Sequence, residues 1–234
     1  CRLWRAICAL GLRASRERDQ MEQDPKTLLL FGDSNTHGTV PLTVLGQPER
    51  YPLAQRWPTL LAQKLGATWR VIDEGLPGRT TLHDDPVEGP HKNGAAALLG
   101  ILESHSPIDT VVVKLGTNDL KPRFCVNAFD IAQSVGKLVR IIRASGCGPA
   151  RGIPRVIVVC PPQIEERGVL AEMFRGGAAK SVGLSPAMAE MAAREGVDLV
   201  DLTGAVTVSP VDGIHYEATQ MPRIAELIFA AIQN

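Results

Sequence analysis

The sequence predicts an α/β fold: a flavodoxin-like, doubly wound sheet of five parallel strands with helices on both faces. Three observations lead to this prediction. Apolar runs of strand length alternate along the chain with segments of helical period. The apolar runs are nearly continuous, which is typical of parallel strands that are covered on both faces. The 234 residues are enough for one such domain with a large core, and little more.

The expected elements follow one another in regular alternation. Strands are expected at residues 27–31, 69–73, 108–115, 154–160 and 197–202. Helices are expected at residues 57–65, 95–104, 129–145, 185–195 and 217–232. Residues 108–115 form the clearest strand because they are rich in β-branched side chains. Gly146 and Gly196 each follow a helical segment, as expected of residues that end helices.

Three long loops separate these elements, at residues 35–56, 74–94 and 161–183. Long ordered loops in a compact domain usually build a site or an interface. The loops carry apolar side chains outside the expected elements, including Val40, Leu42, Val44, Leu45, Val169, Leu170, Met173 and Phe174. We therefore expect a homo-oligomer larger than a dimer, in which these loops form part of each site entrance.

Composition excludes several classes of partner. Lys plus Arg equals Asp plus Glu, at 25 each, so no net basic field is present to attract nucleic acid. Aromatic residues make up only 4% of the chain, which argues against a stacking platform for single strands. No apolar segment is long enough to span a membrane. We expect a cytoplasmic protein with neither nucleic acid nor membrane as a partner.

The five cysteines predict neither a disulfide framework nor a structural zinc site, because their number is odd and no C-x-x-C pair occurs. His83, Asp84, Asp85 and His91 could resemble metal ligands, but a solvated or interface loop is the preferred interpretation. No metal and no cofactor are expected.

The first 20 residues differ in composition from the rest of the chain. They contain five arginines and one short apolar stretch, residues 6–12, with no small-residue cleavage site after it. We interpret residues 1–20 as an extension, disordered or non-native, with Met21 as the natural start. Residues 21–234 are then expected to form one domain.

Polar residues follow the ends of several expected strands. They are Gly32-Asp33-Ser34-Asn35 after the first strand, residues 74–81 (EGLPGRTT) after the second, Gly116-Thr117-Asn118-Asp119 after the third, and Asp212-Gly213-Ile214-His215 after the fifth. Ligands bind beyond the carboxyl ends of the strands in open parallel sheets. Four loops therefore bring Ser, Gly, Asn, Asp and His to one edge of the sheet.

These blocks resemble the SGNH (GDSL-type) hydrolase family. The family's order is GDS, a Gly after the second strand, GTND after the third, and D-x-x-H near the C-terminus. The resemblance runs from about Thr27 to the C-terminus. The stretch EGLPGRTT, followed by Asp-Asp-Pro and Asn-Gly, is most similar to the arylesterase and acyltransferase branch. The resemblance implies the SGNH hydrolase fold and octameric assembly, as in related acyltransferases.

The resemblance gives each block a role in ester chemistry. Ser34 is the expected nucleophile, His215 the base that takes its proton, and Asp212 the group that orients the base. The resemblance also assigns the oxyanion hole to the backbone N–H groups of Ser34 and Gly78 and to the Asn118 amide. Asp33 is expected to brace the nucleophile turn. Asn35, Pro77, Phe174 and Ile214 are the expected substrate-binding residues, with Leu76 and Leu170 also at an apolar mouth.

The predicted function is hydrolysis of short-chain acyl (acetyl or aryl) esters through an acyl-enzyme, with transfer to alcohols or peroxide where water is scarce. The expected partner is a small-molecule ester. The runner-up is a carbohydrate O-acetylesterase, which Asn35 and His37 favour because they make the site more polar than the family pattern. A non-catalytic binding module that kept the fold is a third hypothesis, which intact Ser34, Asn118, Asp212 and His215 argue against. Taken singly, Ser34 could only cap a helix and His215 could be a core histidine. A dinucleotide-binding protein is disfavoured because G-x-G-x-x-G spacing is missing.

Overall fold

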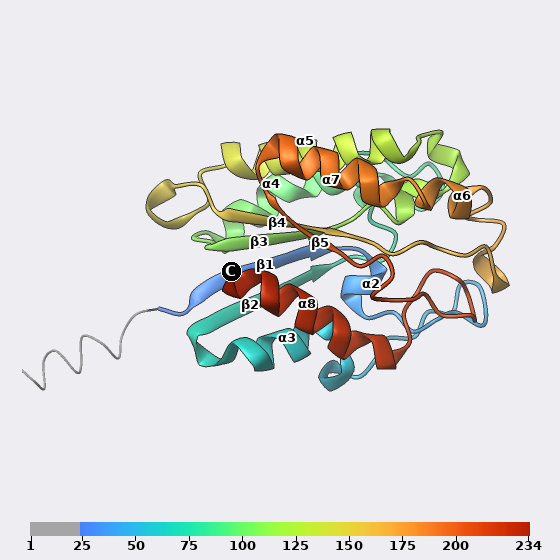
Figure 1. Ribbon diagram of the computed structural model, residues 1–234, viewed down its shortest axis with the longest axis horizontal. Coiled ribbons are helices and arrows are strands. Elements are labelled where there is room, and N and C mark those ends of the chain that lie inside the picture. Colours follow the sequence, from blue (N-terminus) through green and yellow to red (C-terminus); the bar gives the residue numbers. More distant parts are fainter. Residues whose placement is uncertain (1–23) are drawn as a thin grey trace, which may run out of the picture.

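The computed structural model describes residues 24–234, and they form the predicted parallel sheet (Figure 1). Its strands are β1 (Lys26–Gly32), β2 (Trp69–Gly75), β3 (Thr110–Lys114), β4 (Arg155–Cys160) and β5 (Asp198–Asp201). Their spatial order is β2-β1-β3-β4-β5, and every neighbouring pair is parallel. This order is the flavodoxin-like arrangement, so the predicted fold class is confirmed. The predicted extension, residues 1–20, lies outside the described residues.

Helices cover both faces of the sheet. In Figure 1, α4 (Gly94–His105), α5 (Ala128–Ala144) and α7 (Leu184–Glu195) lie on one face, while α3 (Trp57–Leu65) and α8 (Met221–Gln233) lie on the other. Each main helix matches a predicted one to within a few residues. The largest difference is at α8, which begins four residues later than expected because a 3₁₀ turn, residues 218–220, precedes it. Among residues 24–234, no helix is long and apolar enough to cross a membrane.

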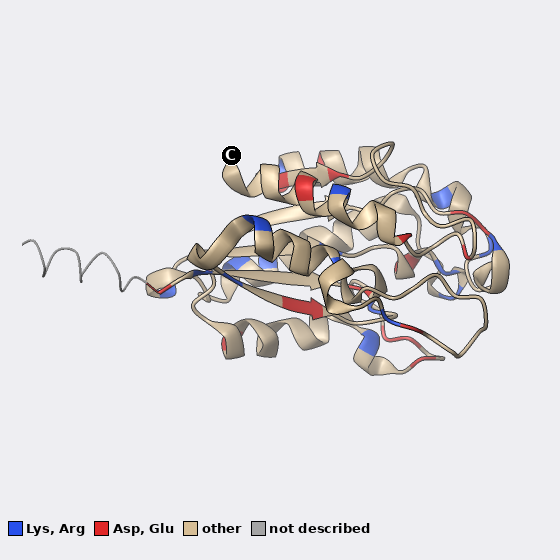
Figure 2. Cartoon of the chain, turned by 90° about the horizontal axis from the view of Figure 1, so that it is seen from below, with Lys and Arg blue, Asp and Glu red and all other residues tan. Residues whose placement is uncertain are grey.

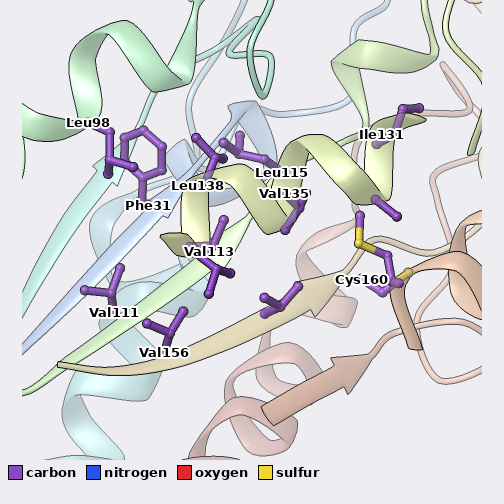
Figure 3. Close-up of a cluster of buried hydrophobic side chains, with 14 of the residues drawn as sticks. Phe31, Leu98, Val111, Val113, Leu115, Ile131, Val135, Leu138, Val156 and Cys160 are labelled. Atoms are coloured by element: carbon purple, nitrogen blue, oxygen red, sulfur yellow. The ribbon is translucent and has the colours of Figure 1, made fainter. Parts of the chain in front are cut away.

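Alternation along the strands divides the core into two layers. Phe31, Val111, Val113 and Val156 point towards α4 and α5, where they pack against Leu98 and Leu138 (Figure 3). The intervening residues, such as Leu30 and Val112, point to the α3 and α8 face and pack with Trp57. Because successive strand side chains alternate between faces, a polar residue at a strand end points to one layer only.

Two short helices break up the predicted loops. Helix α2 (Ser34–His37) follows β1 directly, and α6 (Gly177–Ser181) lies inside the predicted third loop. The apolar side chains of the predicted loops differ in exposure. Leu170 and Phe174 are buried in the core of their own domain, whereas Val44 and Leu45 are 48% and 58% exposed. Lys, Arg, Asp and Glu are interspersed in the view of Figure 2.

Candidate active site

The nucleophile turn joins β1 to α2. Asp33 is the N-cap of α2, and its Oδ1 accepts the backbone N–H of Asn35 at 3.0 Å. Gly32 is required here because a Cβ atom would lie 2.0 Å from the Thr36 hydroxyl. Ser34 is thus held as the first helical residue at the carboxyl end of a central strand. The bracing role that we predicted for Asp33 agrees with this geometry.

The base comes from the loop between β5 and α8. The Oδ1 atom of Asp212 accepts the backbone N–H groups of Ile214 and His215, at 3.0 and 2.9 Å. Its Oδ2 atom lies 2.6 Å from His215 Nδ1 and also accepts the Leu42 N–H at 2.7 Å. His215 Nε2 lies 3.0 Å from Ser34 Oγ, across 181 residues of sequence. The structure therefore brings the three predicted triad residues into one hydrogen-bonded row.

Electrostatics favour an ionised Asp212. Burial of the carboxyl group alone would raise its pKa. The hydrogen bond and charge of His215, with the two backbone N–H donors, outweigh burial, so the pKa of Asp212 lies below its usual value. A carboxylate facing Nδ1 keeps the proton on that nitrogen, which leaves Nε2 free to accept the proton of Ser34.

The predicted oxyanion donors lie around the same cavity as the triad. Ser34, Gly78, Asn118 and His215 all line a cavity of about 260 Å³. The Asn118 amide donates one hydrogen bond to the Arg79 carbonyl, at 3.1 Å, and carries a second N–H. Gly78 has φ +79°, and a Cβ atom there would lie 2.4 Å from Glu88 Oε2. The positive φ is what favours glycine at this position, because the Glu88 carboxylate is the movable end of a flexible side chain.

Two loops on the oxyanion side are tied together by buried polar contacts. Asp119 accepts the backbone N–H of Thr81 at 3.0 Å and its hydroxyl at 2.5 Å. Burial raises the pKa of Asp119, although the Thr81 hydrogen bonds oppose that effect. The Arg79 guanidinium donates to the carbonyls of Gly32, at 2.9 Å, and Glu74. Sequence reasoning missed Arg79, whose burial lowers its pKa to about 10.

Three of the four predicted substrate-binding residues line the cavity: Pro77, Phe174 and Ile214. Asn35 has a different position, and the prediction for it needs correction. Its side-chain amide donates to the Ile214 carbonyl at 3.1 Å, and the residue is only 1% exposed. Asn35 therefore links the nucleophile helix to the base loop. Leu170 lines the cavity as expected, whereas Leu76 is not among the lining residues.

The cavity wall also contains a charged pair that sequence reasoning missed. Lys121 Nζ lies 2.5 Å from Glu88 Oε1, and both residues line the cavity. Asp85 and Arg123 extend the pair into a group of two acids and two bases, with 3.0 Å between Asp85 Oδ1 and Arg123 Nη1. Lys121 follows the GTND block by two residues, which is the one sequence signal that could have identified it.

The metal alternative is not supported by the described part of the chain. Asp85 is bonded to Arg123 and to backbone N–H groups, and His83 stacks on Phe124 with 5.4 Å between ring centroids. Within residues 24–234, no group of three or more His, Cys, Asp or Glu side chains is arranged to hold a metal ion.

Comparison with known proteins identifies the family. The GDSL-like lipase/acylhydrolase family model matches residues 30–219. An inhibitor-bound aryl esterase from M. smegmatis is 35% identical with a TM-score of 0.84, and a carbohydrate acetylesterase from Sinorhizobium meliloti is 35% identical with a TM-score of 0.83. Each alignment covers 89% of this chain and 98% of the other. No match was found among curated proteins. The chain belongs to the GDSL-like lipase/acylhydrolase family of ester hydrolases, which have the SGNH fold.

Proposed function

We propose that this esterase is of the arylesterase/acyltransferase type and hydrolyses short-chain acyl esters through an acyl-enzyme on Ser34. The observation that carries the proposal is the hydrogen-bonded row Asp212–His215–Ser34, with 2.6 and 3.0 Å between the successive pairs of atoms, at the wall of an apolar cavity. Such a row supplies an activated nucleophile, an oriented base and a place for the acyl group.

In the proposed reaction, His215 Nε2 takes the Ser34 proton as Oγ attacks the ester carbonyl. Asp212 stabilises the imidazolium that forms. The backbone N–H groups of Ser34 and Gly78 and the Asn118 amide stabilise the oxyanion. His215 then protonates the departing alcohol, which leaves an acyl group on Ser34. A water molecule, or a second alcohol, attacks this acyl-enzyme with His215 again acting as base, and Ser34 is regenerated.

The cavity indicates small, neutral, mainly apolar substrates. Its volume of about 260 Å³ is small, and many lining residues are apolar, including Leu42, Pro77, Met173, Phe174 and Ile214. The one cation on its wall, among the residues described, is paired with Glu88. Because the group Asp85, Glu88, Lys121 and Arg123 has no net charge, an anionic ester gains little attraction there.

A panel of aryl and alkyl esters tests this proposal. We expect hydrolysis of aryl acetates, with activity falling as the acyl chain lengthens, and an added alcohol should divert part of the product to a new ester. The matched comparison is acetate against succinate half-ester, since the latter adds a negative charge. A wild-type protein without measurable hydrolysis of any acetate in the panel would contradict the proposal.

The second candidate function is a carbohydrate O-acetylesterase. It is favoured by the similarity to the S. meliloti carbohydrate acetylesterase, which equals that to the aryl esterase in identity. Both candidates share the acetyl half of the substrate and differ in the alcohol. Peracetylated sugars should therefore be assayed beside aryl acetates. A kcat/KM for the sugar ester at least tenfold above that for the aryl ester would favour the second function.

We also propose that the protein assembles into a homo-oligomer, with the octamer as our expectation. Leu45 supports the proposal because it lines the cavity and is 58% exposed, beside the exposed Val44. A partner chain that covered these two side chains would narrow the cavity mouth. Light scattering at micromolar concentration tests this, with Leu45→Glu as the variant expected to lower the mass. A fully active wild-type monomer would overturn it.

A further inference from the structure

Lys114 is a charged residue in the apolar interior. It is the last residue of β3, it is 1% exposed, and it shares with Val112 the sheet face covered by α3 and α8. An ammonium group in such a place is costly unless an opposite charge or a polarisable surface lies beside it. Lys114 has both. Asp33, the opposite charge, precedes Ser34 in the chain, and Tyr216, the polarisable ring, follows His215.

The first neighbour is Asp33, which precedes the nucleophile. The Nζ atom of Lys114 lies 4.0 Å from Asp33 Oδ1, and this oxygen also accepts the Asn35 N–H that begins α2. Asp33 is itself fully buried. The carboxylate that caps the nucleophile helix thus has Lys114 as a buried counter-charge, in a place where water screens neither group. The Arg79 guanidinium, which donates to the Gly32 carbonyl, is a second positive charge near Asp33 but makes no ion pair with it.

The second neighbour is Tyr216, which follows the base. Lys114 Nζ lies 4.9 Å from the centroid of the Tyr216 ring. The backbone of Tyr216 is held as well, since its carbonyl accepts the Tyr51 hydroxyl at 3.2 Å. One buried side chain therefore contacts residues adjacent to both Ser34 and His215, which must stay 3.0 Å apart although 181 residues separate them.

These contacts depend on charge more than on fixed hydrogen bonds. Lys114 Nζ, Asp33 Oδ2 and Tyr216 OH have no hydrogen-bond partner within residues 24–234. Burial alone would lower the pKa of Lys114, but Tyr216 and Asp33 more than offset it and place the pKa above its usual value. Burial also raises the pKa of the Tyr216 hydroxyl, so at neutral pH Asp33 is the negative charge that favours the ammonium form of Lys114. The thiol of Cys160 is a further titratable group nearby, and its pKa, raised to about 12 by burial and then by the charge of Asp201, keeps it neutral.

We propose that Lys114 is a positioning residue: through its contacts with Asp33 and Tyr216, it fixes the position of the nucleophile turn relative to the base loop. The inference rests on the proposed esterase function. Without Lys114, Asp33 loses the cation that lies 4.0 Å from it, and only Arg79, which makes no ion pair with it, remains as a nearby positive charge beside the Ser34 turn. The turn must then move towards water or the carboxyl group must take up a proton, and either change disturbs the Ser34–His215 distance.

The test compares Lys114→Met, Asp33→Asn, the double variant and Val112→Ala. Met has nearly the length of Lys without its charge, and Asn still caps a helix. Val112→Ala is the matched control, because Val112 is buried on the same strand and the same face and carries no charge. Measurements are kcat and KM for an aryl acetate across pH, the rate at which a fluorophosphonate labels Ser34, and thermal melts.

We expect Lys114→Met to lower both kcat and the labelling rate about tenfold or more, with KM within about threefold of wild type. Loss of a positive charge favours the protonated base, so the acid limb of the pH–rate profile should move up by about half a pH unit. The double variant should recover most of the lost kcat, because the buried Asp33 carboxylate that lost its Lys114 partner is replaced by a neutral amide. Val112→Ala should lower the melting temperature while kcat and the acid limb stay unchanged.

Three results would overturn the inference: wild-type kcat in Lys114→Met, an equal kcat loss in Val112→Ala, or a double variant no better than Lys114→Met. If Lys114→Met does not fold, the test compares the double variant with Asp33→Asn. The inference then requires a higher kcat in the double variant than in Asp33→Asn. A wild-type protein that hydrolyses no ester but is labelled at Ser34 would contradict only the proposed function, because the labelling rates of the variants would still test the positioning role of Lys114. A wild-type protein that neither hydrolyses an ester nor is labelled at Ser34 would contradict both the proposed function and the positioning role of Lys114.

Discussion

The base side and the oxyanion side of the cavity are built in different ways. On the base side, Asp212 and His215 are three residues apart, and most of their hydrogen bonds lie within one short loop. On the oxyanion side, contacts cross between two loops that are almost 40 residues apart, as from Asn118 to Arg79 and from Asp119 to Thr81. The proposed base and its orienting acid therefore have local support, while the proposed oxyanion donors depend on tertiary packing. Variants should separate these two kinds of dependence.

The largest effect is expected from Ser34→Ala. Ser34 belongs to both sides of the cavity, because its hydroxyl faces His215 and its backbone N–H is a predicted oxyanion donor. Loss of the nucleophile should reduce turnover on an aryl acetate by about four to six orders of magnitude. The melting temperature should change little, because only the Ser34–His215 hydrogen bond is removed. Steady-state kinetics beside a thermal melt measure both quantities. A variant with a tenth of wild-type turnover would refute the role of Ser34.

The next largest effect is expected from Asn118→Ala, on the oxyanion side. Loss of one oxyanion donor should lower kcat by about 10²–10³. The Arg79 carbonyl also loses its partner, so stability should fall by about 1 kcal/mol, unlike in Ser34→Ala. Denaturant unfolding measures this difference. Unchanged turnover in a folded Asn118→Ala variant would remove this residue from the oxyanion hole.

A smaller effect is expected from Thr81→Val, which weakens the link between the two oxyanion loops. The change removes the hydroxyl that donates to Asp119 and should cost about 1.5–3 kcal/mol of stability, because the acceptor is a buried carboxylate. We expect kcat to fall only a few-fold, since no donor to the substrate is lost. Thr80→Val is the matched control, because the Thr80 hydroxyl contacts only neutral backbone groups: it lies within donor distance of the His83 and Lys92 carbonyls and accepts the His83 N–H. Equal stability losses in both variants would argue against the special role of Asp119.

The smallest effect is a difference in how the two sides respond to acid. The pKa of Asp212 is lowered in the fold, so its stabilising contribution is present above the unfolded value of 3.8 and is lost as pH falls through the folded pKa. The pKa of Asp119 is raised, so its contribution is full below 3.8 and declines as pH rises through the folded pKa. Asp212→Asn should therefore flatten the acid loss of stability, and Asp119→Asn should steepen it. Melts from about pH 2 to 7 cover both windows, since the Asp212 loss lies below 3.8 and the Asp119 loss above it. If the two substitutions changed the pH dependence of stability in the same direction, the contrast would be contradicted.

The difference between the two sides also explains what sequence reasoning could reach. Ser34, Asp212 and His215 were predicted because each follows a strand in a recognisable block, and the spacing of Asp212 and His215 is set by one turn. Pro77 and Ile214 lie in the same blocks, whereas Phe174 was predicted as an apolar residue of the third long loop; all three line the cavity. The placement of Asn35 was wrong, because a residue beside the nucleophile can point either to the cavity or to the base loop. Only the packing of α2 against that loop decides which.

The sequence by itself determined the parallel α/β fold, the family and the identity of the residues at the sheet edge. Strand and helix patterns are local, and the carboxyl ends of parallel strands meet wherever such a sheet forms. Tertiary structure alone decided that Lys121 pairs with Glu88 and that Lys114 lies beside Asp33 and Tyr216. It also decided that Leu170 and Phe174 pack into the core of the same domain. The reason is physical: the direction of a side chain and its partner depend on segments far apart in the chain, which no local pattern records.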